Sequence, residues 1–374
     1  MKKTFAILSA TVLCLIMGAC GNKNHFTING SVDLPELEGR TVYVLNMSKE
    51  DPTPESCSDN DGPVDSAVVV NGKFTLNGTV EEPWMALVGC PGSSLCIMVV
   101  VEPGTIEVTM DSIGGTPLND RLQVARKKMD VSDLKEEMDV YARQYYSATD
   151  AAKRAEAEHL YDSVDAIASA RMLEANWALY HENEDNLLAM VAMENILNAG
   201  EFTYNELDSI VKVASPCVAN NKNVQAKLSQ LKAIDATSAG KHYVDIQGVD
   251  GKLSDLIDGK LALVDFYASW CGPCRAEIKD NLVPLWKKYQ KKGLVIVGLN
   301  VWERGDAAAR KAAHKKVMAD LGITYPQLVD STRTATDTYG VNGIPQIMLI
   351  GPDGTILARD LRGAAIEEAI IKAL

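Results

Sequence analysis

The sequence predicts three structural regions in order: a small antiparallel β-domain, an α-helical middle region and a C-terminal α/β domain. Short apolar runs broken by turn residues fill residues 20–117, and apolar residues at helical spacing follow over 118–235. From 236 to 374, apolar strands alternate with amphipathic helices, which is typical of a sheet covered by helices on both faces. Residues 1–19 precede these regions as a leader.

In the β-domain, Asn71-Gly72 predicts a tight hairpin turn, because both positions of such a turn need a positive φ angle. Cys90 and Cys96 flank a second turn, where they either form a disulfide or remain thiols. The expected strands cover residues 26–30, 41–45, 68–76 (the hairpin), 85–88, 96–101 and 105–110.

The apolar pattern of the middle region predicts four or five helices. Leu160, Val164 and Met172 lie on one face of the longest apolar pattern, and we expect the Met, Tyr and Trp side chains of this region to pack in a core. The helical patterns start at residue 122 and continue over 151–177, 187–197 and 206–213.

In the C-terminal domain, the run Leu261–Tyr267 is apolar apart from Asp265, which indicates a central strand covered on both faces. A lone buried carboxyl should have a raised pKa and is often a general acid or base; alternatively, it turns to the surface or accepts a backbone N–H. The expected strands are 260–267, 294–301, 346–350 and 355–359, and the expected helices 271–291, 307–321 and 364–374.

The N-terminus has the pattern of an export signal. Lys2 and Lys3 precede an apolar stretch too short to span a bilayer, and the stretch ends in Gly18-Ala19-Cys20. This end resembles a bacterial lipobox, which implies acylation of Cys20, a lipid anchor in the membrane and a cell-envelope location facing the periplasm. A plain secretory cut after Ala19 is the alternative, and Met17 fits it poorly because that cut prefers a small residue there.

The net charge excludes nucleic acid as a partner. The chain has 37 Lys and Arg against 50 Asp and Glu, and loss of Lys2 and Lys3 with the leader gives 35 − 50 = −15. A surface this acidic repels a phosphate backbone.

Two of the cysteines form the motif Cys271-Gly272-Pro273-Cys274, directly after the central strand and at the start of a helix. A helix N-terminus favours the thiolate, which is the nucleophile of disulfide exchange. We expect Cys271 to be the exposed attacking residue and Cys274, one turn further, to resolve the mixed disulfide. Pro273 fits the first helical turn, where its missing N–H costs little.

Other chemistries fit the motif less well. A structural zinc site needs four ligands, but there is no second Cys-x-x-Cys pair and the five histidines are scattered. A purely structural disulfide does not require a helix start after a buried strand, and no peroxidase-type loop surrounds Cys271. We expect no metal and no cofactor apart from the cysteine pair.

Cys57 and Cys217 are isolated in the sequence, and their pairing stays open.

Residues 263–274 resemble the active-site segment of thioredoxin, and 341–345 with the strand after them resemble the second signature of that family. The resemblance implies a thioredoxin-like fold with a cis Pro345 beside the cysteines, which presents backbone to an extended substrate and keeps metals away from the thiols. It also implies a substrate-contacting surface. That surface comprises Trp270, Gly272, Pro273, Ile344 and Pro345.

An extra helix after residues 294–301, followed by 325–330, resembles the membrane-tethered ResA/TlpA-like branch of the family. Glu303 matches an acid found near the active site in some of that branch, whereas the position of Asp265 there is often Asn. Which of the two acids titrates with the cysteines stays open. The β-domain resembles a module that precedes thioredoxin domains in Gram-negative lipoproteins and brings no catalytic residues.

The resemblance implies a thiol-disulfide oxidoreductase acting on protein disulfides. Gly272-Pro273 and Ile344 match reducing members, so we expect a protein-disulfide reductase that receives electrons from a transmembrane thiol donor. A disulfide isomerase is one alternative. In the other, the N-terminal regions are a partner-binding or homodimerising platform and the redox domain is accessory.

Overall fold

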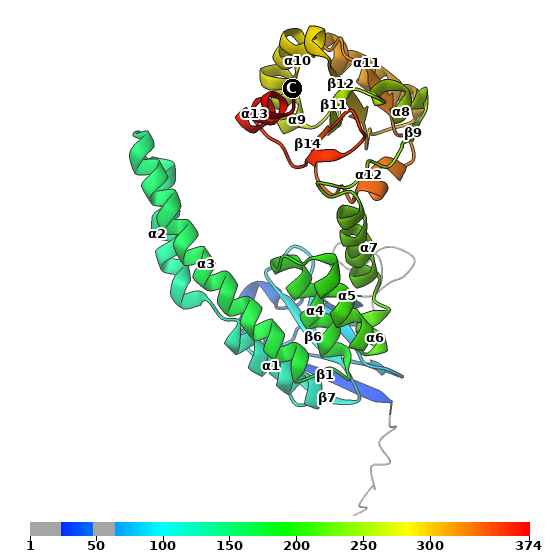
Figure 1. The fold of residues 1–374 in the computed structure, drawn as a ribbon. Helices are drawn as coiled ribbons and strands as arrows, with labels where there is room; N and C mark the ends of the chain where they lie inside the picture. Colours follow the sequence, from blue (N-terminus) through cyan, green and yellow to red (C-terminus); the bar gives the residue numbers. More distant parts are fainter. Residues whose placement is uncertain (1–23, 48–63) are drawn as a thin grey trace, which may run out of the picture. The chain divides into compact units, whose positions relative to one another are not determined.

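The computed structural model describes residues 24–47 and 64–374, and its internal contacts divide the chain into two units, 1–192 and 193–374 (Figure 1). The expected leader, the expected lipidation site Cys20 and Cys57 lie outside the described residues.

The first unit begins with two four-stranded sheets, in the orders β4-β1-β7-β8 and β3-β2-β5-β6. The predicted antiparallel β-domain is therefore present, although one pair, β1 with β7, is parallel. The strand bounds are β1 His25–Ser31, β2 Thr41–Asn46, β3 Asp65–Val68, β4 Lys73–Thr79, β5 Trp84–Gly89, β6 Cys96–Val101, β7 Gly104–Val108 and β8 Ile113–Gly114, with a 3₁₀ turn η1 at Pro35–Leu37.

The predicted Asn71-Gly72 turn forms, with φ angles of 53° and 68°, but the hairpin prediction was wrong beyond it. Among the described residues, the only backbone pairing between the two arms is the bridge between Val70 and Lys73. Beyond it, β3 pairs with β2, and β4 pairs with β1. The two arms enter different sheets because each finds a longer antiparallel partner elsewhere.

Cys90 and Cys96 are not joined in the structure. Cys96 is exposed and lies opposite Gly89 in the pairing of β5 with β6, whereas Cys90 is buried one residue further on. Successive residues of a strand face opposite sides, so the two thiols point away from each other.

Two buried polar side chains hold α1 (Pro117–Lys128) to the end of β6. Asn119 accepts the N–H of Val100 at 2.9 Å and donates to the carbonyl of Val100 at 2.7 Å. Glu102 accepts the N–H of Leu118, one of the N–H groups that a helix start leaves without a partner. The contact satisfies the backbone at the end of β6 and the first turn of α1 together.

We predict that Asn119→Ala loosens this junction, because it leaves the N–H and C=O of Val100 buried without partners, at a cost of about 1–3 kcal/mol each. Hydrogen exchange followed by mass spectrometry should show faster exchange in peptides covering β6 and α1. The control is Asn77→Ala, an exposed residue of β4. Equal exchange in both variants would contradict the assignment.

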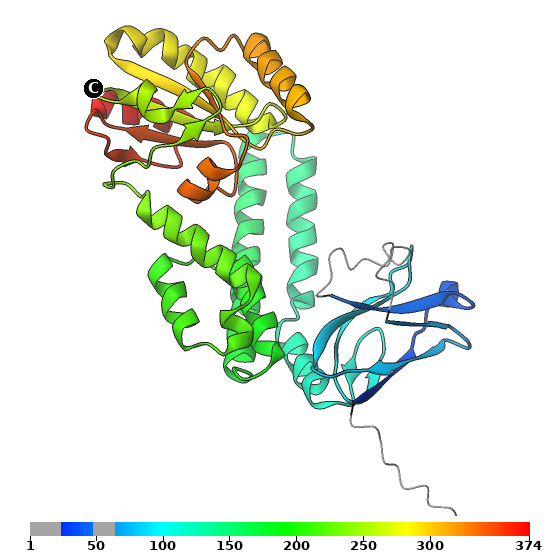
Figure 2. The same ribbon diagram turned by 90° about the vertical axis from the view of Figure 1, so that its right-hand side faces the viewer.

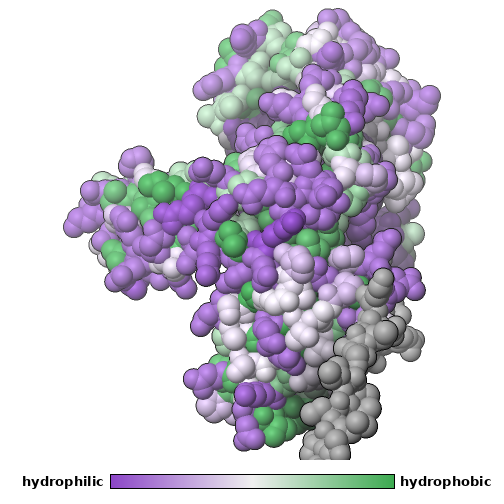
Figure 3. Space-filling model, turned by 90° about the horizontal axis from the view of Figure 1, so that it is seen from below, coloured by the Kyte–Doolittle hydropathy of each residue, from purple (hydrophilic) through white to green (hydrophobic). Residues whose placement is uncertain are grey.

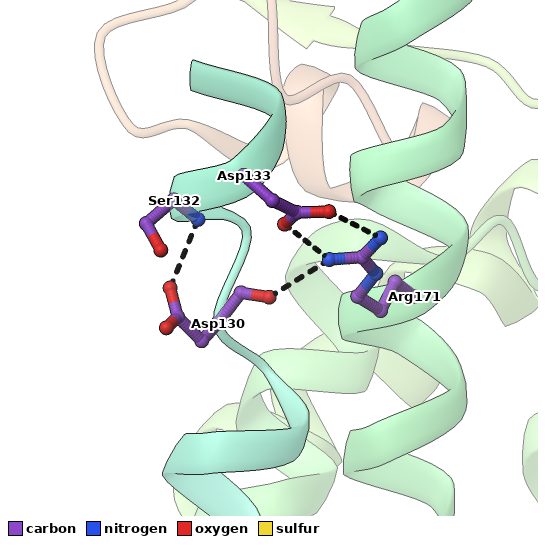
Figure 4. A network of polar contacts seen from close by, with 4 residues as sticks. All are labelled: Asp130, Ser132, Asp133 and Arg171. Carbon is purple, nitrogen blue, oxygen red and sulfur yellow. Dashed lines mark hydrogen bonds and ion pairs between the residues drawn. The ribbon is translucent and has the colours of Figure 1, made fainter. Parts of the chain in front are cut away.

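The helices α2 (Ser132–Ser147) and α3 (Ala151–His181) lie side by side as an antiparallel hairpin (Figures 1 and 2). Arg171 on α3 donates to both carboxylate oxygens of Asp133, at 2.6 and 3.1 Å, and to the carbonyl of Asp130 (Figure 4). Asp130 accepts the N–H of Ser132 at the start of α2. These contacts fix the base of the hairpin.

Residues 117–236 form seven helices rather than the four or five that we predicted. The helix α2 has no fully buried side chain, and α6 spans only four residues. Neither helix therefore has the strong apolar stripe on which the prediction depended. The remaining bounds are α4 Leu187–Ala199, which contains the division between the units, α5 Tyr204–Val213, α6 Pro216–Ala219 and α7 Lys222–Ala236.

The C-terminal α/β prediction is confirmed by a five-stranded sheet in the order β13-β12-β11-β14-β15. The pairs β11–β12 and β12–β13 are parallel, and β14 is antiparallel to β11. A short hairpin, β9–β10, precedes this sheet. The bounds are β9 Gln247–Gly248, β10 Gly251–Lys252, β11 Leu261–Tyr267, β12 Leu294–Asn300, β13 Gln327–Val329, β14 Gln346–Ile350 and β15 Ile356–Ala358.

Helices cover both faces of this sheet, and each face has its own apolar layer. Ala262, Val264 and Phe266 of β11 contribute to the layer under α8 and α12. Leu263 and Tyr267 contribute to the opposite layer, which includes side chains of α9, α10, α11 and α13. The helix bounds are α8 Leu253–Ile257, α9 Gly272–Glu277, α10 Val283–Tyr289, α11 Ala307–Leu321, α12 Thr334–Tyr339 and α13 Ala364–Ala373.

The face of the molecule in Figure 3 is mainly hydrophilic, with scattered apolar side chains, as is usual for a folded protein. Within residues 24–47 and 64–374, no helix is long and apolar enough to cross a membrane.

Candidate active site

The cysteine pair lies where β11 ends and α9 begins. Cys271 is the N-cap residue of α9, and the helix continues through a π-turn at Ile278–Leu282 into α10. Cys271 and Cys274 form a disulfide, with their Cα atoms 5.3 Å apart. Cys271 is only 5% exposed, so the expectation of an exposed Cys271 was wrong: the start of α9 and the Ile344 carbonyl lie close to its sulfur. Cys274 is completely buried, so Cys271 is still the more accessible of the two.

The surroundings of Cys271 favour a negative charge on its sulfur after reduction. The backbone N–H of Cys274 points at Cys271 Sγ from 3.2 Å, at the positive end of the helix. Such a position lowers the pKa of a thiol and raises the fraction of thiolate. The carbonyl oxygen of Ile344 lies 3.7 Å from the same sulfur.

The antiparallel pairing of β14 brings Pro345 to the same edge of the sheet as the cysteines. Phe266 lies opposite Gln346, so the residue before Gln346 lies beside the end of β11. The Ile344–Pro345 peptide bond is cis. The guanidinium of Arg362 donates to the carbonyl of Pro345.

An open surface surrounds Cys271. The Trp270 side chain is 43% exposed, and a Cβ atom added at Gly272 would meet no atom within 4 Å. Pro273 is exposed and Ile344 is half-buried. The structure thus brings the five predicted substrate-contacting residues around Cys271, with the buried Pro345 beside it.

Asp265 faces the same layer as Cys274. The alternation along β11 places its side chain on the side of Leu263 and Tyr267, which pack in one cluster with both cysteines. Asp265 is 1% exposed, and neither carboxyl oxygen has a hydrogen-bond partner among the described residues. Burial, assisted by the negative charge of Glu277 and opposed by Arg362, raises the pKa of Asp265 to about 8.

Glu303 is instead engaged with the loop before the cysteines. Its carboxylate accepts the N–H and the hydroxyl of Ser269, each at 2.6 Å, and the side-chain amide of Asn300 at 2.8 Å. The neighbouring carbonyl of Trp302 accepts the indole N–H of Trp270 at 2.9 Å. These contacts tie the loop of the active site to the end of β12.

Two charged residues that act on Asp265, Glu277 and Arg362, were not predicted from the sequence. Glu277 accepts the N–H of Gly363 at 3.0 Å and the side-chain amide of Asn281 at 2.8 Å. Its place three residues after Cys274, on the same helix, was a usable signal. Arg362 is distant in the sequence, and no local pattern placed it here.

Among the residues that the structure describes, no three His, Cys, Asp or Glu side chains are arranged to hold a metal ion.

Residues 230–359 match the AhpC/TSA family, and residues 26–122 match a domain of unknown function, DUF4369. The chain is 32% identical to the thiol-disulfide oxidoreductase ResA of Bacillus subtilis over 128 residues, which are 34% of this chain and 67% of that protein. The chain belongs to this family of thiol-disulfide oxidoreductases. All of this similarity lies in one third of the chain.

A second relative is the thiol:disulfide interchange protein HelX of Rhodobacter capsulatus, 35% identical over 32% of this chain and 61% of that protein. The alignments thus span only 61–67% of the length of these two relatives. One similar solved structure is a putative thiol:disulfide interchange protein DsbE from Chlorobium tepidum. It has 29% identity and a TM-score of 0.32, and the match covers 36% of this chain and 97% of that one.

We predict that Asp265→Asn stabilises the oxidised protein, increasingly so as the pH rises. The folded state keeps the Asp265 proton up to a pKa of about 8, whereas the unfolded chain releases it above about pH 4. The free energy of unfolding of the wild type therefore falls between about pH 4 and pH 8, by about 1.4 kcal/mol per pH unit. The Asp265→Asn variant has no titrating group at this position, so its free energy of unfolding does not fall for this reason.

Urea unfolding at pH 5, 6, 7 and 8 measures the effect, with the exposed Asp280→Asn as the control. The difference between Asp265→Asn and wild type should grow with pH and level off above about pH 8. A difference that stays constant over this range would contradict a raised pKa at Asp265.

Proposed function

We propose that this protein is a protein-disulfide reductase, held by a lipid on Cys20 at a membrane of the cell envelope and facing the periplasm. The observation that carries the redox assignment is the arrangement of three groups: Cys271 at the start of α9, the buried Cys274 and, in the same layer, the carboxyl of Asp265. No described residue forms a hydrogen bond with that carboxyl. The couple needs no further cofactor, because both electrons come from the two thiols.

In the proposed reaction, the Cys271 thiolate attacks one sulfur of a protein disulfide. The substrate S–S bond breaks, a mixed disulfide forms, and the leaving sulfur takes up a proton. Cys274 then gives its proton to the Asp265 carboxylate and attacks Cys271 Sγ, which releases the second substrate thiolate. The substrate gains two electrons, and the cysteine pair becomes a disulfide.

Asp265 suits the second step better than Glu303 does. Its pKa of about 8 lies near the pH of the reaction, so it can gain and lose a proton there. The Glu303 carboxylate already accepts three hydrogen bonds from Ser269 and Asn300, and we assign it to positioning the loop.

The direction of electron flow rests on the residues around the couple. Gly272-Pro273 between the cysteines and Ile344 beside Pro345 resemble the residues at these positions in reducing members of the thioredoxin family. An exported reductase must be reduced again from outside its compartment, and we propose a transmembrane thiol protein as the donor. Extended polypeptides that carry a disulfide would dock on Trp270, Pro273 and Ile344.

We predict that Cys274→Ser accumulates a mixed disulfide with a substrate protein, because the resolving thiol is missing. Non-reducing electrophoresis of the reduced variant mixed with an oxidised test protein should show a covalent adduct. Cys271→Ser should give none, and Cys96→Ser, which removes an exposed thiol elsewhere, should behave as wild type. An adduct of equal yield with Cys271→Ser would contradict the order of attack.

We predict that Asp265→Asn slows the resolving step by about 10²-fold at pH 7, a typical contribution of a general base. Rapid mixing separates the two steps, since adduct formation by Cys271 should keep its wild-type rate. If both steps slow equally, Asp265 only supports the structure and is not the proton acceptor.

A further inference from the structure

A cavity of about 1000 Å³ opens beside the active-site loop, at the edge of the sheet formed by β12 and β13. Its walls come from α11, the loop after β12 and the turn after β13. The volume is that of a site for a small organic molecule, roughly 300–1000 Å³. The reaction proposed above does not use this space.

The rim of the cavity is basic, although the chain as a whole has a net charge of −13. Arg310, Lys311 and Lys315 of α11 and Arg333 line it, and within the described part of the chain none of them forms an ion pair. Three acids also line the cavity. Asp250 is exposed, and Glu303 accepts three hydrogen bonds from Ser269 and Asn300. Asp330 is likewise occupied, since it accepts three hydrogen bonds from residues of the following turn, Thr332 and Ala335.

Asn300, at the end of β12, also lines the cavity and is 1% exposed. Its Nδ2 donates to Glu303, but its Oδ1 has no hydrogen-bond partner among the described residues. Buried acceptors are rarely left without a donor in native proteins. This oxygen is therefore a buried, unsatisfied acceptor at the wall of the cavity, and an N–H or O–H group of a ligand would supply a donor for it.

Apolar side chains of Trp302 and Met318 complete the wall. Trp302 has a φ angle of 54°, in the left-handed region that a bulky residue rarely adopts. Strained residues of this kind cluster at binding sites, where the surrounding structure holds them in place.

We propose that this cavity binds a small amphipathic organic anion. Its apolar body packs against Trp302 and Met318, its carboxylate or sulfonate pairs with Lys311 and Lys315, and an N–H or O–H group donates to Asn300 Oδ1. Because Trp302 and Glu303 also hold Trp270 and Ser269, such a ligand contacts the residues that fix the loop before Cys271.

Three related compounds test each part of this assignment by isothermal titration calorimetry on the oxidised full chain. Indole-3-propionate has an apolar ring, an N–H donor and a carboxylate. Its N-methyl derivative lacks the donor, and indole-3-propionamide lacks the charge. We expect indole-3-propionate to bind and each of the other two to bind at least about tenfold more weakly, because a site built around a polar group rejects analogues that lack it.

The double variant Lys311→Glu/Lys315→Glu should weaken binding of indole-3-propionate at least about tenfold, since the charge that meets the carboxylate is reversed. The matched control is Lys287→Glu/Lys291→Glu, two exposed lysines with the same spacing and no part in the cavity. Wild-type affinity in the control supports the site. No binding of indole-3-propionate at 10 mM (about the weakest affinity worth assigning), equal affinity for all three compounds, or equal weakening in both double variants would overturn the proposal.

Discussion

The active site depends on the register of β11 with its two neighbours. Tyr267 lies opposite Asn300 of β12, and Phe266 lies opposite Gln346 of β14. This register brings the cysteine loop, the Glu303 loop and Pro345 to one edge of the sheet. A shift of β11 by one residue would turn Asp265 to the opposite layer, away from Cys274.

The same strand contains the main conflict between stability and function in this domain. Every residue of β11 is buried, and all but Asp265 are apolar. A carboxyl without a hydrogen-bond partner in such a strand costs folding free energy, and its raised pKa expresses that cost. A polar residue in a strand whose other residues all favour burial lowers stability, and such residues are expected at functional sites.

The sequence allowed prediction where apolar periodicity was strong or a turn needed special residues. The continuous apolar run at 261–267, the amphipathic helix at 206–213 and the Asn71-Gly72 turn are of this kind. Prediction failed where a partner distant in the sequence decides the structure, as in the division of the hairpin between two sheets. At the active site, local order was enough to predict the helix start at Cys271 and the burial of Asp265. The contacts of Glu303 with Ser269, and the effect of Arg362, arise only when separate strands meet.

The reduction potential of the Cys271–Cys274 couple tests the central claim most directly. It can be measured at pH 7 against a glutathione or dithiothreitol buffer, in a form of the chain without residues 1–20, with Trp270 fluorescence as the readout. We expect a value near that of thioredoxin, about −270 mV, as a reductase requires. A value at or above about −180 mV would assign the protein to isomerases or oxidases and contradict the proposed direction of electron flow.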